Sequence, residues 1–179
     1  MSIKVEHLEF TYFEDRKNIL CDLSAEFDAG EITILTGASG CGKSTLLYLA
    51  AGIYPHSAGI LRSGSVSVEG VRLDSLTASK RCALVGMMFQ NPELQFCMDT
   101  VEHELLFCLE NICTPREEMM EKVDGALAFC EISHLKKRTL HSLSGGERQK
   151  VMLACLTLLS PKWLLLDEPF ANIDDASAR

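Results

Sequence analysis

Residues 37–45 are Gly37-Ala38-Ser39-Gly40-Cys41-Gly42-Lys43-Ser44-Thr45, and this stretch decides the fold. It matches G-x-x-x-x-G-K-[ST], the pattern of a loop that wraps phosphate groups. Residues 31–36 before it form a short apolar run, and residues 44–51 after it contain no helix breaker. These flanks predict a buried strand and a helix, which is the context that a phosphate-binding loop requires.

Each type of residue in the loop has a chemical reason to be there. The glycines at 37, 40 and 42 let the backbone turn tightly, so that N–H groups and the start of the next helix point at phosphate oxygens. Lys43 would neutralise charge on the β- and γ-phosphates, and the Ser44 hydroxyl would ligate Mg²⁺. A glycine-rich turn that merely caps a helix would not explain the Lys-Ser pair. We therefore expect residues 37–45 to bind ATP with Mg²⁺.

Two carboxylates follow a second apolar run near the end of the chain. Residues 163–166, Trp-Leu-Leu-Leu, predict a buried strand that delivers Asp167 and Glu168 at its end. Asp167 would hold the Mg²⁺ hydration shell, and Glu168 would polarise the attacking water as a general base. Alone, such a run could simply end a strand. Together with the phosphate-binding loop, it predicts ATP hydrolysis.

The rest of the chain alternates between sheet and helix signals. Short apolar or alternating runs predict further strands at residues 3–10, 23–27, 65–68 and 83–89. Capping patterns predict helix starts at Asp99, Thr114 and Ser144. We therefore expect one domain over residues 1–179, with a core at 1–90 and 161–179 and a helical subdomain at 91–160.

Composition excludes several classes of function. The chain of 179 residues carries a formal net charge of −8, so no basic field is available for nucleic acid. Its apolar runs are too short to span a bilayer, so a role at a membrane would need a partner. Eight cysteines without a C-x-x-C pair, in a chain without a signal peptide, predict reduced thiols in the cytosol. Their spacings do not suit zinc.

A third string identifies a family. Leu143-Ser144-Gly145-Gly146-Glu147-Arg148-Gln149, taken with the two motifs above, closely resembles the signature of ABC ATPases. A helix capping box would explain Ser144 and Glu147 but not the two glycines. The resemblance implies an α/β P-loop NTPase (RecA-like) core, an N-terminal antiparallel β subdomain and an inserted α-helical subdomain. It also implies that Ser144, Gly145 and Gly146 grip the γ-phosphate of ATP on a second, head-to-tail subunit.

The resemblance carries roles over to three more positions. Tyr12 matches the aromatic residue that stacks on adenine, with Phe10 and Phe13 as alternatives. Gln90 matches the glutamine that senses Mg²⁺ and contacts the membrane partner. Asp174, in Ala171-Asn-Ile-Asp, matches the loop through which paired subunits meet.

The sequences of residues 88–95 and 168–172 are most similar to those of the ATPases of energy-coupling-factor and cobalt-type importers. This implies a peripheral protein at the cytoplasmic face of the membrane, bound to integral membrane subunits, that powers uptake of a vitamin or metal ion. The family also carries a switch histidine beyond the position of Arg179, while the histidines here all precede Glu168. We therefore expect a C-terminally incomplete domain that binds MgATP better than it hydrolyses it. A non-transport ABC ATPase and a truncated ATP-binding fragment stay open as alternatives.

Overall fold

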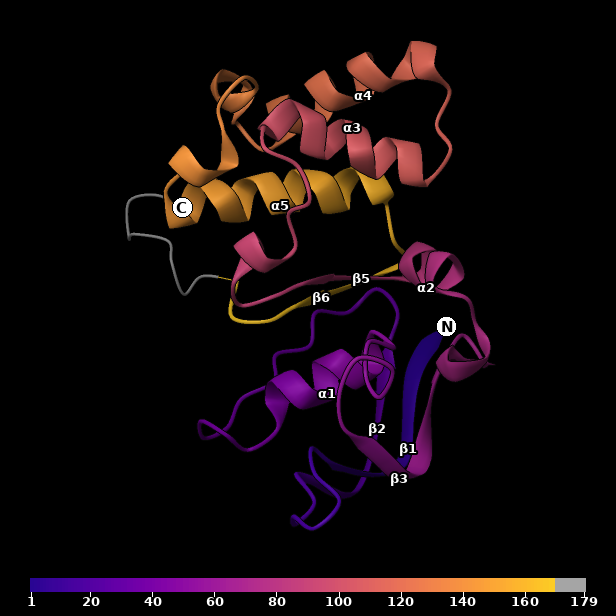
Figure 1. The fold of residues 1–179 in the computed structure, drawn as a ribbon. Coiled ribbons are helices and arrows are strands. Elements are labelled where there is room, and N and C mark those ends of the chain that lie inside the picture. Colours follow the sequence, from indigo (N-terminus) through magenta and orange to yellow (C-terminus); the bar gives the residue numbers. More distant parts are fainter. Residues whose placement is uncertain (170–179) are drawn as a thin grey trace. The chain divides into compact units, whose positions relative to one another are not determined.

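The computed structural model describes residues 1–169, which Figure 1 traces. It has two compact units: the first unit is Met1–Val85, and the second unit begins at Gly86. The expected division into a core and a helical subdomain stays a prediction. Within the described residues, no helix combines the length and the apolar character that crossing a membrane requires.

The first unit contains an antiparallel sheet with strand order β2-β1-β3-β4. Its strands are β1 (Ser2–Thr11), β2 (Leu20–Asp28), β3 (Ile60–Val68) and β4 (Val71–Arg72). The register of β1 shifts between Val5 and Leu8 against β2, and His7 there has a positive φ of 49°. This irregularity moves the buried apolar face from odd to even positions, so the buried apolar residues of β1 are Ile3, Val5, Leu8 and Phe10. The expected N-terminal antiparallel sheet is therefore confirmed.

Two helices accompany this sheet in the first unit. They are α1 (Lys43–Ala50), which starts one residue earlier than expected, and α2 (Ala78–Leu84). The expected strand at residues 31–36 is wrong, because this run has no strand assignment and pairs with no strand in the described part of the chain. Ile32 and Ile34 are 95% and 79% exposed. An apolar run becomes a strand only where a neighbouring strand supplies its hydrogen bonds.

The second unit joins a small sheet to a helical cluster. Strand β5 (Val85–Met88), which begins at the last residue of the first unit, pairs with β6 (Trp163–Leu166). The helices α3 (Val101–Asn111), α4 (Arg116–Phe129) and α5 (Gly145–Leu159) pack on one another (Figure 1). They enclose an apolar core that includes Val101, Leu105, Leu109, Val123, Leu127, Val151 and Cys155.

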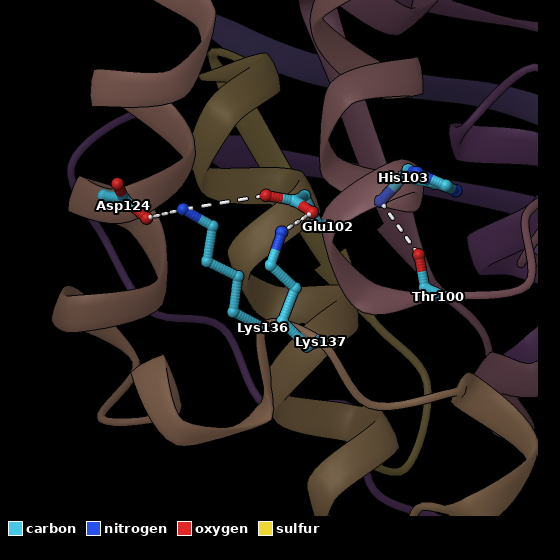
Figure 2. A network of polar contacts seen from close by, with 6 residues as sticks. All are labelled: Thr100, Glu102, His103, Asp124, Lys136 and Lys137. Atoms are coloured by element: carbon cyan, nitrogen blue, oxygen red, sulfur yellow. Dashed lines mark hydrogen bonds and ion pairs between the residues drawn. The ribbon is translucent and has the colours of Figure 1, made fainter.

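The first residues of the helices show how closely local capping patterns predict where a helix begins. Ser144 caps α5 as expected, but α3 is capped by Thr100, whose side chain accepts a hydrogen bond from the His103 N–H (Figure 2), rather than by Asp99. The helix expected to start at Thr114 begins after Pro115.

Strand β6 has the expected bounds but is not buried, since Leu164 and Leu166 are 44% and 36% exposed. Within the described residues it has β5 alone as a neighbour.

Candidate active site

The start of α1 has the form of an anion site. Its N-cap, Gly42, has a φ of 100°, and a Cβ there would come within 2.8 Å of Leu20 Cδ2. The left-handed backbone favours glycine at this position, and a side chain there would also push Leu20 aside. No side chain in the described residues caps α1, and its first turn carries no acidic residue. The N–H groups at the helix start thus suit a bound phosphate.

Lys43 folds back over the loop that precedes it. Its Nζ donates to the carbonyl oxygens of Gly37 and Ala38, each at 2.9 Å. The loop also turns so that the Cys41 N–H donates a hydrogen bond to the Ala38 carbonyl oxygen at 3.3 Å. The structure therefore gathers the ammonium group, the glycines and the exposed Ser39 and Gly40 in one compact loop. The donor set fits the phosphates of a nucleotide.

Tyr12 lies beside this loop's helix. Its hydroxyl is 2.9 Å from Oγ1 of Thr45, a buried residue of α1. Its ring meets Phe10 and Tyr54 edge to face, with centroids 5.3 and 5.8 Å apart. Burial, followed by the hydrogen bond to Tyr12, raises the pKa of Tyr54 to about 12, so this phenol stays neutral.

The aromatic alternatives to Tyr12 differ in exposure. Phe10 is fully buried and cannot present a ring face to adenine, whereas Phe13 is 66% exposed. Tyr12 combines partial exposure with a contact to the residue after Ser44. It therefore suits the adenine position better than Phe10.

In the second unit, three predicted site residues meet at one end of the β5–β6 sheet. The Asp167 N–H donates to the Met88 carbonyl at 3.0 Å, which aligns the ends of the two strands. The amide Nε2 of Gln90 donates to Oε2 of Glu168 at 2.6 Å. The buried Asp167, only 5% exposed, lies between β6 and Glu168 in the chain. These oxygen donors are of the kind that Mg²⁺ prefers.

Glu168 has an unusual backbone. Its φ is 49°, in the left-handed region, and Pro169 follows it. Non-glycine residues rarely adopt this region, and a following proline restricts the backbone further. Such strain persists where surrounding contacts fix a residue, and it is typical of functional positions.

The string Ser144-Gly145-Gly146 forms the start of α5. The Glu147 N–H donates to Ser144 Oγ at 3.3 Å, and the Ser144 N–H donates to Glu147 Oε2 at 2.7 Å. The main cause that lowers the pKa of Glu147 is the hydrogen bond that its carboxylate accepts from the Ser144 N–H. These two hydrogen bonds form a capping box, so the two glycines lie in a well-defined first turn of α5.

One residue in this unit was missed by the sequence reasoning. Gln95 fixes the turn after β5, because its Oε1 accepts from Phe89 N–H at 2.7 Å and its Nε2 donates to the Met87 carbonyl at 2.9 Å. Gln95 ends the string of residues 88–95 that resembles importer ATPases, but that string assigns it no role, so only its contacts reveal one. Lys43, Ser44 and Tyr12 belong to the first unit, whereas Gln90, Asp167, Glu168 and Ser144 belong to the second. Asp174 lies outside the described residues.

A family model described as ABC transporter matches residues 20–171. The chain belongs to this family. Its likeness extends to a solved structure titled cbiO1 from Clostridium perfringens, part of the ABC transporter complex cbiONQ, with 32% sequence identity and a TM-score of 0.81. The match covers 98% of this chain and 68% of that one. The expected P-loop NTPase fold with its antiparallel N-terminal sheet and its helices is confirmed.

Curated relatives of this ABC transporter chain are longer proteins. A putative HMP/thiamine import ATP-binding protein of Bacillus subtilis is 43% identical over 99% of this chain and 32% of its own length. The energy-coupling factor transporter ATP-binding protein EcfA1 of Leuconostoc mesenteroides is 37% identical over 97% of this chain and 61% of its own length. The chain thus spans about a third of the first of these relatives. The expected likeness to energy-coupling-factor and CbiO-type ATP-binding proteins is confirmed.

Proposed function

We propose that this chain binds ATP with Mg²⁺ and hydrolyses it. The observation that carries the proposal is the contact between Gln90 and Glu168, 2.6 Å apart beside the buried Asp167. A phosphate-binding loop, together with an aspartate at the end of a short apolar strand, is the combination expected of a P-loop ATPase. The family to which the chain belongs supports the same reaction.

Each proposed role follows from the chemistry of the side chain. Lys43 and the N–H groups at the start of α1 stabilise charge on the phosphates. Ser44 of the first unit and, in the second unit, Asp167 and Gln90 carry oxygen atoms of the kind that would hold Mg²⁺, and the ion would neutralise phosphate charge when bound. Glu168 accepts the proton of the attacking water, and the hydrogen bond from Gln90 fixes the orientation of its carboxylate.

We further propose that ATP hydrolysis drives transport through integral membrane subunits. The name of one relative, an HMP/thiamine import protein, supports uptake of a vitamin. The resemblance of residues 88–95 and 168–172 to cobalt-type importers keeps a metal ion as the alternative solute. The protein would lie at the cytoplasmic face of the membrane. It would pair head to tail with a second ATPase subunit, to which Ser144, Gly145 and Gly146 offer the start of α5.

The substitution Glu168→Gln tests the catalytic role. It removes the proton acceptor but keeps the size of the side chain, so ATP binding should persist while turnover falls about 100-fold or more. Binding is measured by calorimetry and turnover by phosphate release. Glu110→Gln, at an exposed position of α3, is the matched control. Unchanged turnover in Glu168→Gln would refute the role of Glu168, and a native chain that binds no ATP would refute the proposed function.

A further inference from the structure

Arg148 connects two segments of the second unit. It lies on α5, and its Nη1 forms an ion pair with the Glu93 carboxylate. Its Nε and Nη2 both donate to the carbonyl oxygen of Leu143, at 3.1 and 2.9 Å. A guanidinium group is a planar fork of donors, so it can hold two acceptors in a fixed geometry. Arg148 therefore holds the carbonyl that directly precedes Ser144.

Glu93 belongs to the turn that follows Gln90. This turn is a short 3₁₀ segment, Pro92–Leu94, and Gln95 next to it is hydrogen-bonded to the backbone of Met87 and Phe89. The start of the turn is thus fixed to the end of β5. Glu168 thus contacts Gln90, the chain itself leads from Gln90 to Glu93, and Glu93 pairs with Arg148 at the start of α5.

A second connection joins the same two segments farther along. The Val101 and Glu102 N–H groups donate to the carbonyls of Arg138 and Lys136, both at 3.1 Å. Figure 2 shows the Glu102 carboxylate meeting the ammonium groups of Lys136 and Lys137. The side chain of Glu102 is only 11% exposed, whereas that of Lys137 is 78% exposed, so the connection is shielded from solvent on the Glu102 side. The segment before Ser144 is therefore fixed at one end by Glu102 and at the other by Arg148.

We propose that Arg148 is a positioning residue for ATP hydrolysis, which sets Ser144, Gly145 and Gly146 relative to Gln90 and Glu168. The inference rests on the proposed function. Its carboxylate partner Glu93 is 57% exposed, and exposed ion pairs contribute little to stability. The pair thus serves the geometry of the site rather than the folding of the chain. A movement of the turn after Gln90 would be passed through Arg148 to the start of α5.

A double-mutant cycle with Glu93→Gln and Arg148→Met tests this. Arg148→Met should lower kcat about tenfold and change KM for ATP less than twofold, because Arg148 contacts Glu93 and Leu143, neither of which is assigned to ATP binding. Glu93→Gln should lower kcat less, and the double variant should be no slower than Arg148→Met alone. Glu93→Asp, which keeps the charge, should recover most of the kcat lost in Glu93→Gln. The matched control pair is Glu118→Gln with Lys122→Met, an exposed ion pair on α4, which should leave kcat unchanged.

Hydrogen exchange gives a readout that does not depend on activity. The amides of residues 143–147 should exchange faster in both single variants, whereas those of α4 should not change. Independent, multiplicative effects of the two substitutions on kcat would overturn the inference. So would unchanged exchange at residues 143–147. A native chain without ATP binding or turnover would refute the proposed function, and the exchange data would then still decide whether Arg148 fixes the start of α5.

Discussion

Gly64 is a position where a single methyl group should disrupt the first unit. It has a φ of 90°, and a Cβ there would lie 2.4 Å from the Glu6 carbonyl oxygen and 2.5 Å from that of His7. These are backbone atoms of β1 at its irregular register, so they cannot move aside as a flexible side chain would. Gly64→Ala should lower the free energy of unfolding by about 3 kcal/mol, measured by urea denaturation.

Gly70 provides the matched control for this prediction. Its φ of 78° is similar, but a Cβ there would meet nothing within 4 Å. Gly70→Ala should therefore cost about 1 kcal/mol, the conformational penalty alone. Equal losses of stability in the two variants would show that the close approach to β1 is not the cause.

For single residues, the sequence revealed which residues carry the chemistry, but it did not reveal which of them lie in contact. Tyr12 and Thr45 were both expected to bind nucleotide, yet no pattern predicted that their hydroxyl oxygens would lie 2.9 Å apart. The same holds for the Gln90–Glu168 contact, which joins residues far apart in the chain. Motifs report which chemistry is present, while tertiary contacts depend on how distant segments pack.

At the scale of single elements, the capping box of α5 should give stability a specific pH dependence. Accepting the Ser144 N–H lowers the pKa of Glu147 in the folded state, so its carboxylate favours folding above the ordinary glutamate range. Glu147→Gln keeps an acceptor but loses the charge. At neutral pH the native protein should be more stable than this variant by a few tenths of a kcal/mol.

That difference should disappear as the pH falls through the lowered pKa of Glu147, because protonation then removes the charge from the native protein as well. Thermal unfolding followed by circular dichroism across the acid range measures it. Glu121→Gln, at an exposed position of α4, is the control and should show no such convergence. A stability difference that persists at the acid end would contradict the charge argument.

Helix α5 and residues 31–36 show why some elements follow from sequence and others do not. The start of α5 is specified by contacts within four neighbouring residues, Ser144 to Glu147, so the local pattern is sufficient. The apolar run at 31–36 satisfies the composition of a strand, but its state depends on strands elsewhere. In the described residues it has no strand pairing, and the prediction was wrong there.

At the scale of the whole molecule, both units expose an apolar segment of strand-like sequence. Residues 31–36 of the first unit contain the exposed Ile32 and Ile34. Strand β6 of the second unit exposes Leu164 and Leu166, and in residues 1–169 it pairs with β5 alone. An unpaired apolar strand edge is a template for association with another chain. We therefore expect the 179-residue chain to self-associate as its concentration rises.

The double substitution Leu164→Thr with Leu166→Thr tests this expectation. Threonine retains a strand preference while it removes apolar surface, so β6 should persist and association should weaken. Size-exclusion chromatography with light scattering should show a larger monomer fraction than in the native chain. Leu94→Thr removes a leucine side chain that is more exposed, at 74%, and lies outside any strand, and it should leave the monomer fraction unchanged. If the double variant associated as strongly as the native chain, β6 would not be the surface through which the chains associate. The segment around Ile32 and Ile34 would then be the next to substitute.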